Sequence, residues 1–297
     1  MYRSFLPPII KQILLFLLLS AISPLYAETL YLGSVGDDPS EEIEEFQSLA
    51  VYLKDQLEGS KIDQVNTIVA ANVSEMAGLI ASNKVHLYID SPFPSLVVAN
   101  KAKSNIFLRR WKKGVSEYRS VIFSRKDSGI DSLDAMKGQI VVFEDSSSTS
   151  SFFLPKTTML EYGLKLKPVT QGDSVADDTV GFLFSDDDRN TMIWVLREKI
   201  AIGAMNETAY KKLAKKRLKD LQVIAASQYV PRHVISHSPN MDPALVEQVR
   251  QILLHMHERE DGREALKAFS KTTRFDDFPG GVEEHIAPLR RLLKYYK

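Results

Sequence analysis

Residues 139–155 read QIVVFEDSSSTSSFFLP, and the interpretation of the rest of the chain starts from them. Ile140–Phe143 is a short apolar run of the kind that forms a buried strand. A series of hydroxyl residues follows at Ser146–Ser151, and Phe152–Tyr162 then has the pattern of a helix that ends at Gly163. A strand that turns into a helix in this way gathers backbone N–H and side-chain O–H groups at the positive end of the helix dipole. The stretch therefore predicts either an anion-binding turn or a simple helix cap.

The composition of the 297 residues limits the class of protein. Lys+Arg and Asp+Glu both number 38, so the charge balance does not point to nucleic acid or an anionic membrane as a partner. The chain has no cysteine, which excludes disulfides, thiolate metal sites and a cysteine nucleophile. Its length is sufficient for two ordinary domains, each with its own core.

The N-terminus has the layout of a secretory signal peptide. Arg3 and Lys11 supply positive charge, Ile13–Ile22 is apolar, and Ser23–Ala27 ends in a small residue. The apolar run is short for a membrane span, so we expect cleavage after Ala27, with an uncleaved anchor as the alternative. The sequence thus predicts that residues 1–27 are a signal peptide and that the protein is periplasmic.

Strands and helices alternate in two separate parts of the chain. In the first part the expected strands are Thr29–Val35, Thr67–Ala71 and Val85–Ile89, with helices between them, which predicts a parallel α/β lobe. The serine-rich stretch belongs to a second such part, and the chain is expected to cross between the parts near Val115–Ser120 and Val230–Ser236. This predicts an α/β fold of two lobes with a hinged cleft between them. The first lobe would comprise residues 28–116 and 234–297, and the second residues 117–233.

Polar residues follow two of the expected strands directly. Asp90-Ser91-Pro92-Phe93 comes after the third strand, at the position where open α/β sheets bind ligands. Ser185-Asp186-Asp187-Asp188-Arg189 comes after the expected strand Thr179–Phe184 in the second lobe. Both stretches are therefore candidates for the walls of the cleft.

Several short motifs occur in a fixed order around the serine-rich stretch. They are YRSVIF at 118–123, DSGI at 127–130, FED at 143–145, STS at 148–150, and, less sharply, DSPF at 90–93 and GAMN at 203–206. This ordered set resembles the phosphate-, phosphite- and phosphonate-binding proteins of ABC importers, which have the type II periplasmic binding protein fold. The resemblance extends from Leu30 to about Met256.

The resemblance implies that the Ser-Thr-Ser turn holds the oxyanion of a ligand, which here places that role on Ser148, Thr149 and Ser150. The chain departs from the family at two places. The glycine that usually follows the turn is Ser151, and the second-lobe loop, which often offers a His beside an Asp, reads Ser185–Arg189.

The acidic loop has three interpretations that the sequence leaves open. Three carboxylates beside a dianion repel it unless one is protonated or is paired with a cation, and Arg189 is a candidate for that cation. Alternatively, Asp187 accepts a hydrogen bond from a protonated oxyanion or from an amine of the ligand. In the third interpretation, Asp186–Asp188 only cap the next helix.

The sequence therefore predicts a solute-binding protein of an ABC importer that captures a small oxyanion and performs no chemistry on it. The predicted site consists of Asp90, Ser91, Ser148, Thr149, Ser150, Asp187 and Arg189. We expect a membrane permease as partner, a monomeric state, and no cofactor, nucleic acid or metal; the His255–Glu258 segment lacks zinc-site spacing. One alternative is the same module serving a membrane sensor protein. Another is a two-lobed enzyme that uses Asp186–Asp188 and the serines, although a nucleophile motif such as GxSxG is absent.

Overall fold

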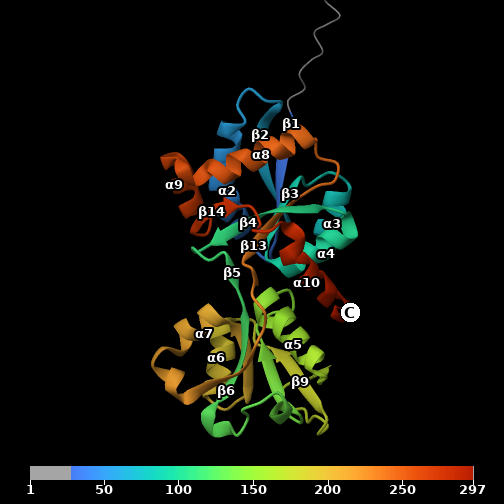
Figure 1. Ribbon diagram of the computed structural model, residues 1–297, viewed down its shortest axis with the longest axis vertical. Helices are drawn as coiled ribbons and strands as arrows, with labels where there is room; N and C mark the ends of the chain where they lie inside the picture. Colours follow the sequence, from blue (N-terminus) through green and yellow to red (C-terminus); the bar gives the residue numbers. More distant parts are fainter. Residues whose placement is uncertain (1–27, 297) are drawn as a thin grey trace, which may run out of the picture.

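The protein folds into two lobes, one above the other in Figure 1, and its chain passes between them twice. The computed structural model describes residues 28–296. The predicted signal peptide, residues 1–27, lies outside the described residues. Within residues 28–296, no helix combines the length and the apolar character that crossing a membrane requires.

Six strands form the sheet of the first lobe, in the order β14-β4-β13-β3-β1-β2. Their bounds are β1 Glu28–Val35, β2 Ile62–Ala70, β3 Leu87–Asp90, β4 Asn105–Lys112, β13 His233–His237 and β14 Thr272–Asp276. β1 pairs in parallel with β2 and β3, as predicted. β13 and β14, which come after the chain has returned from the other lobe, pair antiparallel with their neighbours. The three predicted strands are therefore parallel to one another, and the returning part of the chain makes the complete sheet mixed.

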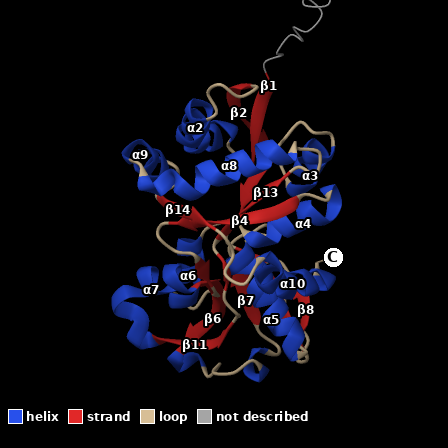
Figure 2. Ribbon diagram, turned by 45° about the horizontal axis from the view of Figure 1, so that its top comes forward, coloured by secondary structure: helices blue, strands red, loops and turns tan. Residues whose placement is uncertain are grey.

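Helices cover both faces of this sheet, as Figure 2 shows. Their bounds are α2 Pro39–Gln56, α3 Val73–Ala81, α4 Pro92–Ala102, α8 Pro243–His255, α9 Glu260–Ala268 and α10 Val282–Leu292. Phe46 of α2 and Val249 of α8 belong to one apolar core, whereas Leu96 of α4 and Leu289 of α10 belong to another. A sheet that is covered on both faces explains the continuous apolar runs in its strands.

The second lobe repeats this plan with the strand order β11-β6-β10-β7-β9-β8. Its elements are β6 Ser120–Arg125, β7 Ile140–Phe143, α5 Leu154–Tyr162, β8 Lys165–Pro168, β9 Thr179–Phe184, α6 Asp188–Leu196, β10 Ile202–Asn206, α7 Glu207–Ala214 and β11 Leu221–Ala226. The central strand β7 is parallel to both β9 and β10. The carboxyl ends of these three strands therefore meet at one edge, where α/β sheets bind ligands.

Short turns of other helix types connect the main elements. The 3-10 segments are Lys126–Ser128, Asp134–Met136, Lys215–Asp220, Met256–Glu258 and Leu293–Tyr295, and a π-helical segment, η3, spans Thr149–Phe153. The α-helix α7 ends at Ala214, because the φ of 43° at Lys215 is not compatible with a continuing α-helix.

A short two-stranded ribbon connects the lobes. It consists of β5, Glu117–Tyr118, and β12, Val230–Pro231, which pair antiparallel. Both strands lie within the two predicted crossings of the chain. With two crossings that pair with each other, the fold has the connection that hinge motion between lobes requires.

Aromatic side chains also bring the lobes into contact beside this ribbon. The ring of Phe93 in α4 stacks on the ring of Phe153 in η3, with centroids 4.1 Å apart and planes 10° from parallel. Both rings belong to the core that contains Leu289 of α10. The two lobes thus share one apolar cluster next to the cleft.

Candidate functional site

The serine-rich turn forms the N-terminal end of a helix that faces the first lobe. Ser148 is its N-cap, and the Ser148 hydroxyl accepts a hydrogen bond from the Ser151 backbone N–H at 3.1 Å. The helical segment begins at Thr149, three residues before the predicted start, and η3 continues directly into α5. The positive end of the helix dipole therefore lies at Ser148–Ser150.

The opposite wall is the N-terminal end of α4 in the first lobe. Its N-cap, Ser91, makes no side-chain capping bond. Instead, the Thr149 hydroxyl accepts a hydrogen bond from the Phe93 backbone N–H at 3.0 Å and donates one to the Ser91 hydroxyl at 2.9 Å. A side chain of the second lobe thus caps a helix of the first lobe, and two helix N-termini meet across the cleft.

These two helix ends border a cavity of about 250 Å³, which we call the serine chamber. Five of the seven predicted site residues line it: Asp90, Ser91, Ser148, Thr149 and Ser150. It is also lined by residues that the sequence did not single out as site residues, among them Tyr118, Glu144, Asp188, Asn206, Arg232 and His233. The structure therefore brings together residues of both lobes and of the connecting ribbon.

The remaining two predicted residues, Asp187 and Arg189, line an adjoining cavity of about 300 Å³, which we call the cationic chamber. The cationic chamber shares four lining residues with the serine chamber: Tyr118, Asp188, Asn206 and Arg232. Asp187 is the N-cap of α6, and its side chain accepts hydrogen bonds from the backbone N–H groups of Arg189 and Asn190. Of the three interpretations of the acidic loop, this geometry supports the helix cap for Asp187.

Arg232 is the cation that both chambers share, and the sequence analysis missed it. Its guanidinium carbon lies 4.4 Å from the centroid of the Tyr118 ring, a cation–π geometry. Among the described residues, no carboxylate forms a salt bridge with Arg232. The signal in the sequence was its position directly after Val230–Pro231, in one of the predicted crossings.

Two carboxylates of the second lobe, Asp188 and Glu144, line the serine chamber. The Ser151 hydroxyl donates a hydrogen bond to Asp188 Oδ1 at 3.2 Å. Burial and the nearby Glu144 raise the pKa of Asp188 to about 6, and burial also raises the pKa of Glu144. Ser151 stands where the family described in the sequence analysis usually has glycine, so this departure introduces a hydroxyl group that binds Asp188.

Asp90 is held from two sides at the end of β3. The Tyr88 hydroxyl donates to Asp90 Oδ2 at 2.6 Å, and the Ser91 backbone N–H donates to Oδ1 at 2.5 Å. Burial still raises its pKa, because it outweighs these hydrogen bonds. Nearby, burial and several cations hold the pKa of His233 well below its ordinary value, so this histidine is neutral at pH 7.

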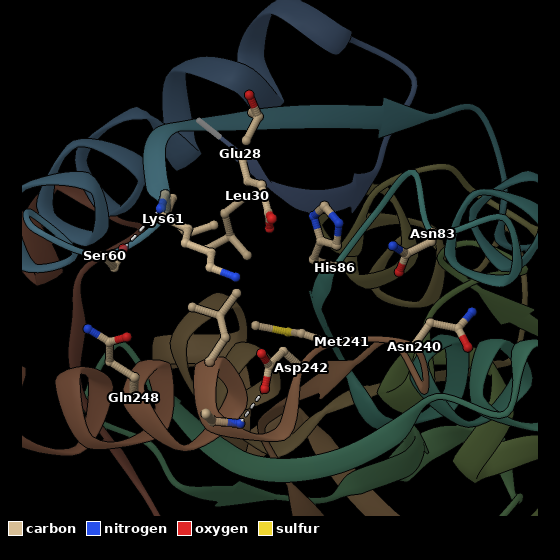
Figure 3. Close-up of a pocket in the computed structure, with 14 residues that line it drawn as sticks. Glu28, Leu30, Ser60, Lys61, Asn83, His86, Asn240, Met241, Asp242 and Gln248 are labelled. Carbon is tan, nitrogen blue, oxygen red and sulfur yellow. Dashed lines mark hydrogen bonds between the residues drawn. The ribbon is translucent and has the colours of Figure 1, made fainter. Parts of the chain in front are cut away.

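One further cavity lies away from the two chambers. Within residues 28–296, no group of three or more His, Asp or Glu residues is arranged to hold a metal ion. A separate cavity of about 430 Å³ lies in the first lobe between the starts of β1 and α8 (Figure 3). It contains His86, whose Nδ1 accepts a hydrogen bond from the Tyr31 backbone N–H at 2.9 Å. This cavity shares no lining residue with either chamber.

Solved structures of other proteins have the same fold. XAC2383 from Xanthomonas citri, bound to chloride ion or to ATP, matches 90% of this chain at 22% identity, with TM-scores of 0.83 and 0.82 and 98% and 97% of the other chain covered. PhnD1 from Prochlorococcus marinus, in complex with methylphosphonate, matches 91% of this chain and 98% of its own at 15% identity and a TM-score of 0.64. A binding protein component of an ABC phosphonate transporter from Pseudomonas aeruginosa, PA3383, matches 91% of this chain and 86% of its own at 16% identity and a TM-score of 0.61.

These likenesses confirm the predicted two-lobed α/β fold. A family model described as "ABC transporter, phosphonate, periplasmic substrate-binding protein" matches residues 36–278. The match includes parts of both lobes, the connecting ribbon and, apart from Val35, every residue that lines the two chambers. The chain therefore belongs to the family of phosphonate-type periplasmic substrate-binding proteins of ABC transporters.

Proposed function

We propose that this protein captures a small phosphate-, phosphite- or phosphonate-like oxyanion in the serine chamber and delivers it to a membrane permease. The observation that carries the proposal is the meeting of two helix N-termini, at Ser148–Ser150 and at Ser91, in a chamber that also contains Arg232. Helix N-termini attract anions through the helix dipole and through free backbone N–H groups. At α4 the dipole is the main contribution, because Pro92 and Pro94 have no N–H group and the Phe93 N–H bonds to Thr149. The guanidinium of Arg232 supplies donors that match an oxyanion.

The hydroxyl groups of the turn would contact the ligand directly. Thr149 and Ser91 now bond to each other across the cleft. An oxyanion between them would replace this single bond with one hydrogen bond from each hydroxyl to a ligand oxygen. Hydrogen bonds to charged acceptors are about twice as strong as neutral ones, so the exchange favours the bound state.

The carboxylates of the chamber select the form of the ligand. Asp90, Glu144 and Asp188 all have raised pKa values because they are buried. A protonated carboxyl can donate to the oxyanion, whereas an ionised one repels it or accepts a hydrogen bond from a protonated ligand oxygen or an amine. The ligands in the structures of XAC2383 and PhnD1, which are chloride, ATP and methylphosphonate, are all anionic.

Ligand binding would close the two lobes about the β5–β12 ribbon. We assign residues 28–116 and 234–297 to the first lobe and residues 117–233 to the second. In the closed state both lobes would present one joint surface to the permease, in the periplasm, and the ligand would leave chemically unchanged. The chain would act as a monomer, because the site is complete within one copy.

The proposal is tested with the purified protein and a set of anions: phosphate, phosphite, methylphosphonate, aminoethylphosphonate and sulfate. A ligand that binds only the folded state adds about 2.7 kcal/mol of stability at a hundredfold excess over its dissociation constant, which raises the melting temperature. We expect such a rise with at least one phosphorus oxyanion. Thr149→Ala should remove it, whereas Ser146→Ala, an exposed serine of the same turn outside the chamber, should not. No rise with any of these anions, or a rise that survives Thr149→Ala, would contradict the proposal.

A further inference from the structure

The cationic chamber contains more positive charge than a single small oxyanion in the serine chamber requires. Five of its lining residues are cations, and two are carboxylates: Lys112, Lys113, Arg189, Lys212 and Arg232 against Asp187 and Asp188. They come from β4 and the turn after it in the first lobe, from α6 and α7 in the second, and from the ribbon. Both lobes thus direct cations toward the same space.

Most of these cations have no counter-charge. Among the described residues, no salt bridge involves Lys113, Arg189 or Lys212, and Arg232 is unpaired as well. Lys112 lies 3.7 Å from Glu45, yet burial and the neighbouring Arg110 lower its pKa to about 8. Asp187 is occupied by its capping bonds to α6. Like charges from two lobes repel each other when the lobes close, unless an anion lies between them.

The two chambers are contiguous. They share Tyr118, Asp188, Asn206 and Arg232 as lining residues, so Arg232 lies where one chamber joins the other. Pockets for drug-sized ligands have volumes of about 300–1,000 Å³. The serine chamber alone, at about 250 Å³, lies below that range, whereas the connected cleft has room for a longer molecule.

We propose that the ligand has two anionic groups: a phosphate or phosphonate held at Ser148–Ser150 in the serine chamber, and a second anionic group held by Arg189, Lys212 and Lys113 in the cationic chamber. This inference rests on the proposed function, because it places one end of the ligand on the serine turn. Arg232, at the junction, contacts both ends. The substrate class is therefore an organic phosphate or phosphonate with a second acidic group.

The test compares probes that differ only in the second charge. Phosphonoacetate and the longer phosphonobutyrate each carry a carboxylate, and the alkylphosphonates of the same chain length carry a methyl group in its place. We expect at least one carboxylate probe to bind the wild-type protein about tenfold more tightly than its alkyl partner in isothermal titration calorimetry, with an advantage that shrinks as salt is raised.

Substitutions test whether the tighter binding of the carboxylate probes depends on the cationic chamber. Arg189→Ala combined with Lys212→Ala should reduce the advantage to about twofold or less and leave alkylphosphonate binding unchanged. Lys219→Ala, an exposed lysine beyond α7 and outside the chamber, is the matched control and should preserve it. Two outcomes would overturn the inference and leave the proposed function intact. In the first, both carboxylate probes bind with the same affinity as their alkyl partners. In the second, the tighter binding of a carboxylate probe survives the double substitution. If no phosphonate binds at all, the proposed function fails first.

Discussion

The serine chamber and the cationic chamber adjoin each other, yet their polar groups are organised in opposite ways. In the serine chamber, several hydroxyl and carboxyl groups are already paired, as Thr149 is with Ser91 and Asp90 is with Tyr88. In the cationic chamber, Arg189 and Lys212 are exposed and have no paired carboxylate among the described residues. Buried polar groups must be satisfied, so the first chamber is fixed in geometry, whereas long exposed side chains can adapt to different ligands. The first chamber should therefore determine which oxyanion binds, and the second what is attached to it.

The largest effect on ligand affinity is expected from substitution of Arg232, which lines both chambers. Arg232→Ala should weaken the binding of any phosphorus oxyanion by about ten- to a hundredfold, because a hydrogen bond to a charged group contributes about 1.5–3 kcal/mol. Calorimetric titration measures the loss. The melting temperature of the ligand-free protein should change little, because Arg232 has no ion pair among the described residues and its contact with the Tyr118 ring contributes about 1 kcal/mol at most.

Arg232→Lys is the control for this substitution. It keeps the charge but loses the stacking on Tyr118 and the two-pronged geometry, so an intermediate affinity is expected. A loss of less than twofold in Arg232→Ala would show that Arg232 does not bind the oxyanion.

A smaller effect, on both stability and ligand affinity, is expected from the protonation of Asp188. Its pKa in the folded protein is about 6, raised above an ordinary value of 3.8, so the folded state disfavours the ionised form. Its ionisation therefore costs stability as the pH rises from about 4 to 6, by at most about 3 kcal/mol above that window. Asp188→Asn should accordingly have a higher melting temperature than the wild type at pH values above 6, and the same melting temperature as the wild type below pH 4.

The same titration should affect ligand affinity. Above pH 6 an ionised Asp188 repels the oxyanion, so Asp188→Asn should bind it about fivefold more tightly than the wild type at pH 8 and equally well at pH 5. The affinity of Asp188→Asn is divided by that of the wild type at each pH. Titration of the ligand affects both proteins equally and therefore cancels in this ratio. A ratio that stays constant from pH 5 to pH 8 would contradict the assignment of Asp188 to the chamber wall.

The smallest effect on binding is expected from Asp187. Asp187→Ala removes the cap of α6 and should lower the free energy of unfolding by about 1 kcal/mol, as measured by urea denaturation. Methylphosphonate affinity should change by less than about twofold. Asp187→Ser keeps a capping oxygen and should restore most of the stability. A large loss of affinity at unchanged stability would instead mean that Asp187 contacts the ligand.

Much of the fold and part of the site were predictable from local sequence. The strand, the hydroxyl series and the helix of residues 139–155 lie next to one another in the chain, so their arrangement follows from short-range rules of helix starts. The two crossings were predictable because they separate two series of alternating strands and helices. β14 was not predicted, because its place at the edge of the first sheet depends on pairing with β4, far away in the sequence.

What the sequence by itself determined is thus the two-lobed α/β plan and the serine turn at a helix start. Only the tertiary structure decided which partners face that turn: Arg232 beside the ribbon, Ser91 from the other lobe, and the two carboxylates Glu144 and Asp188. It also decided that Asp188, rather than Asp187, faces the serine chamber. The physical reason is that helix caps depend on neighbours within about four residues, whereas a cleft between lobes is formed by contacts between residues distant in the sequence.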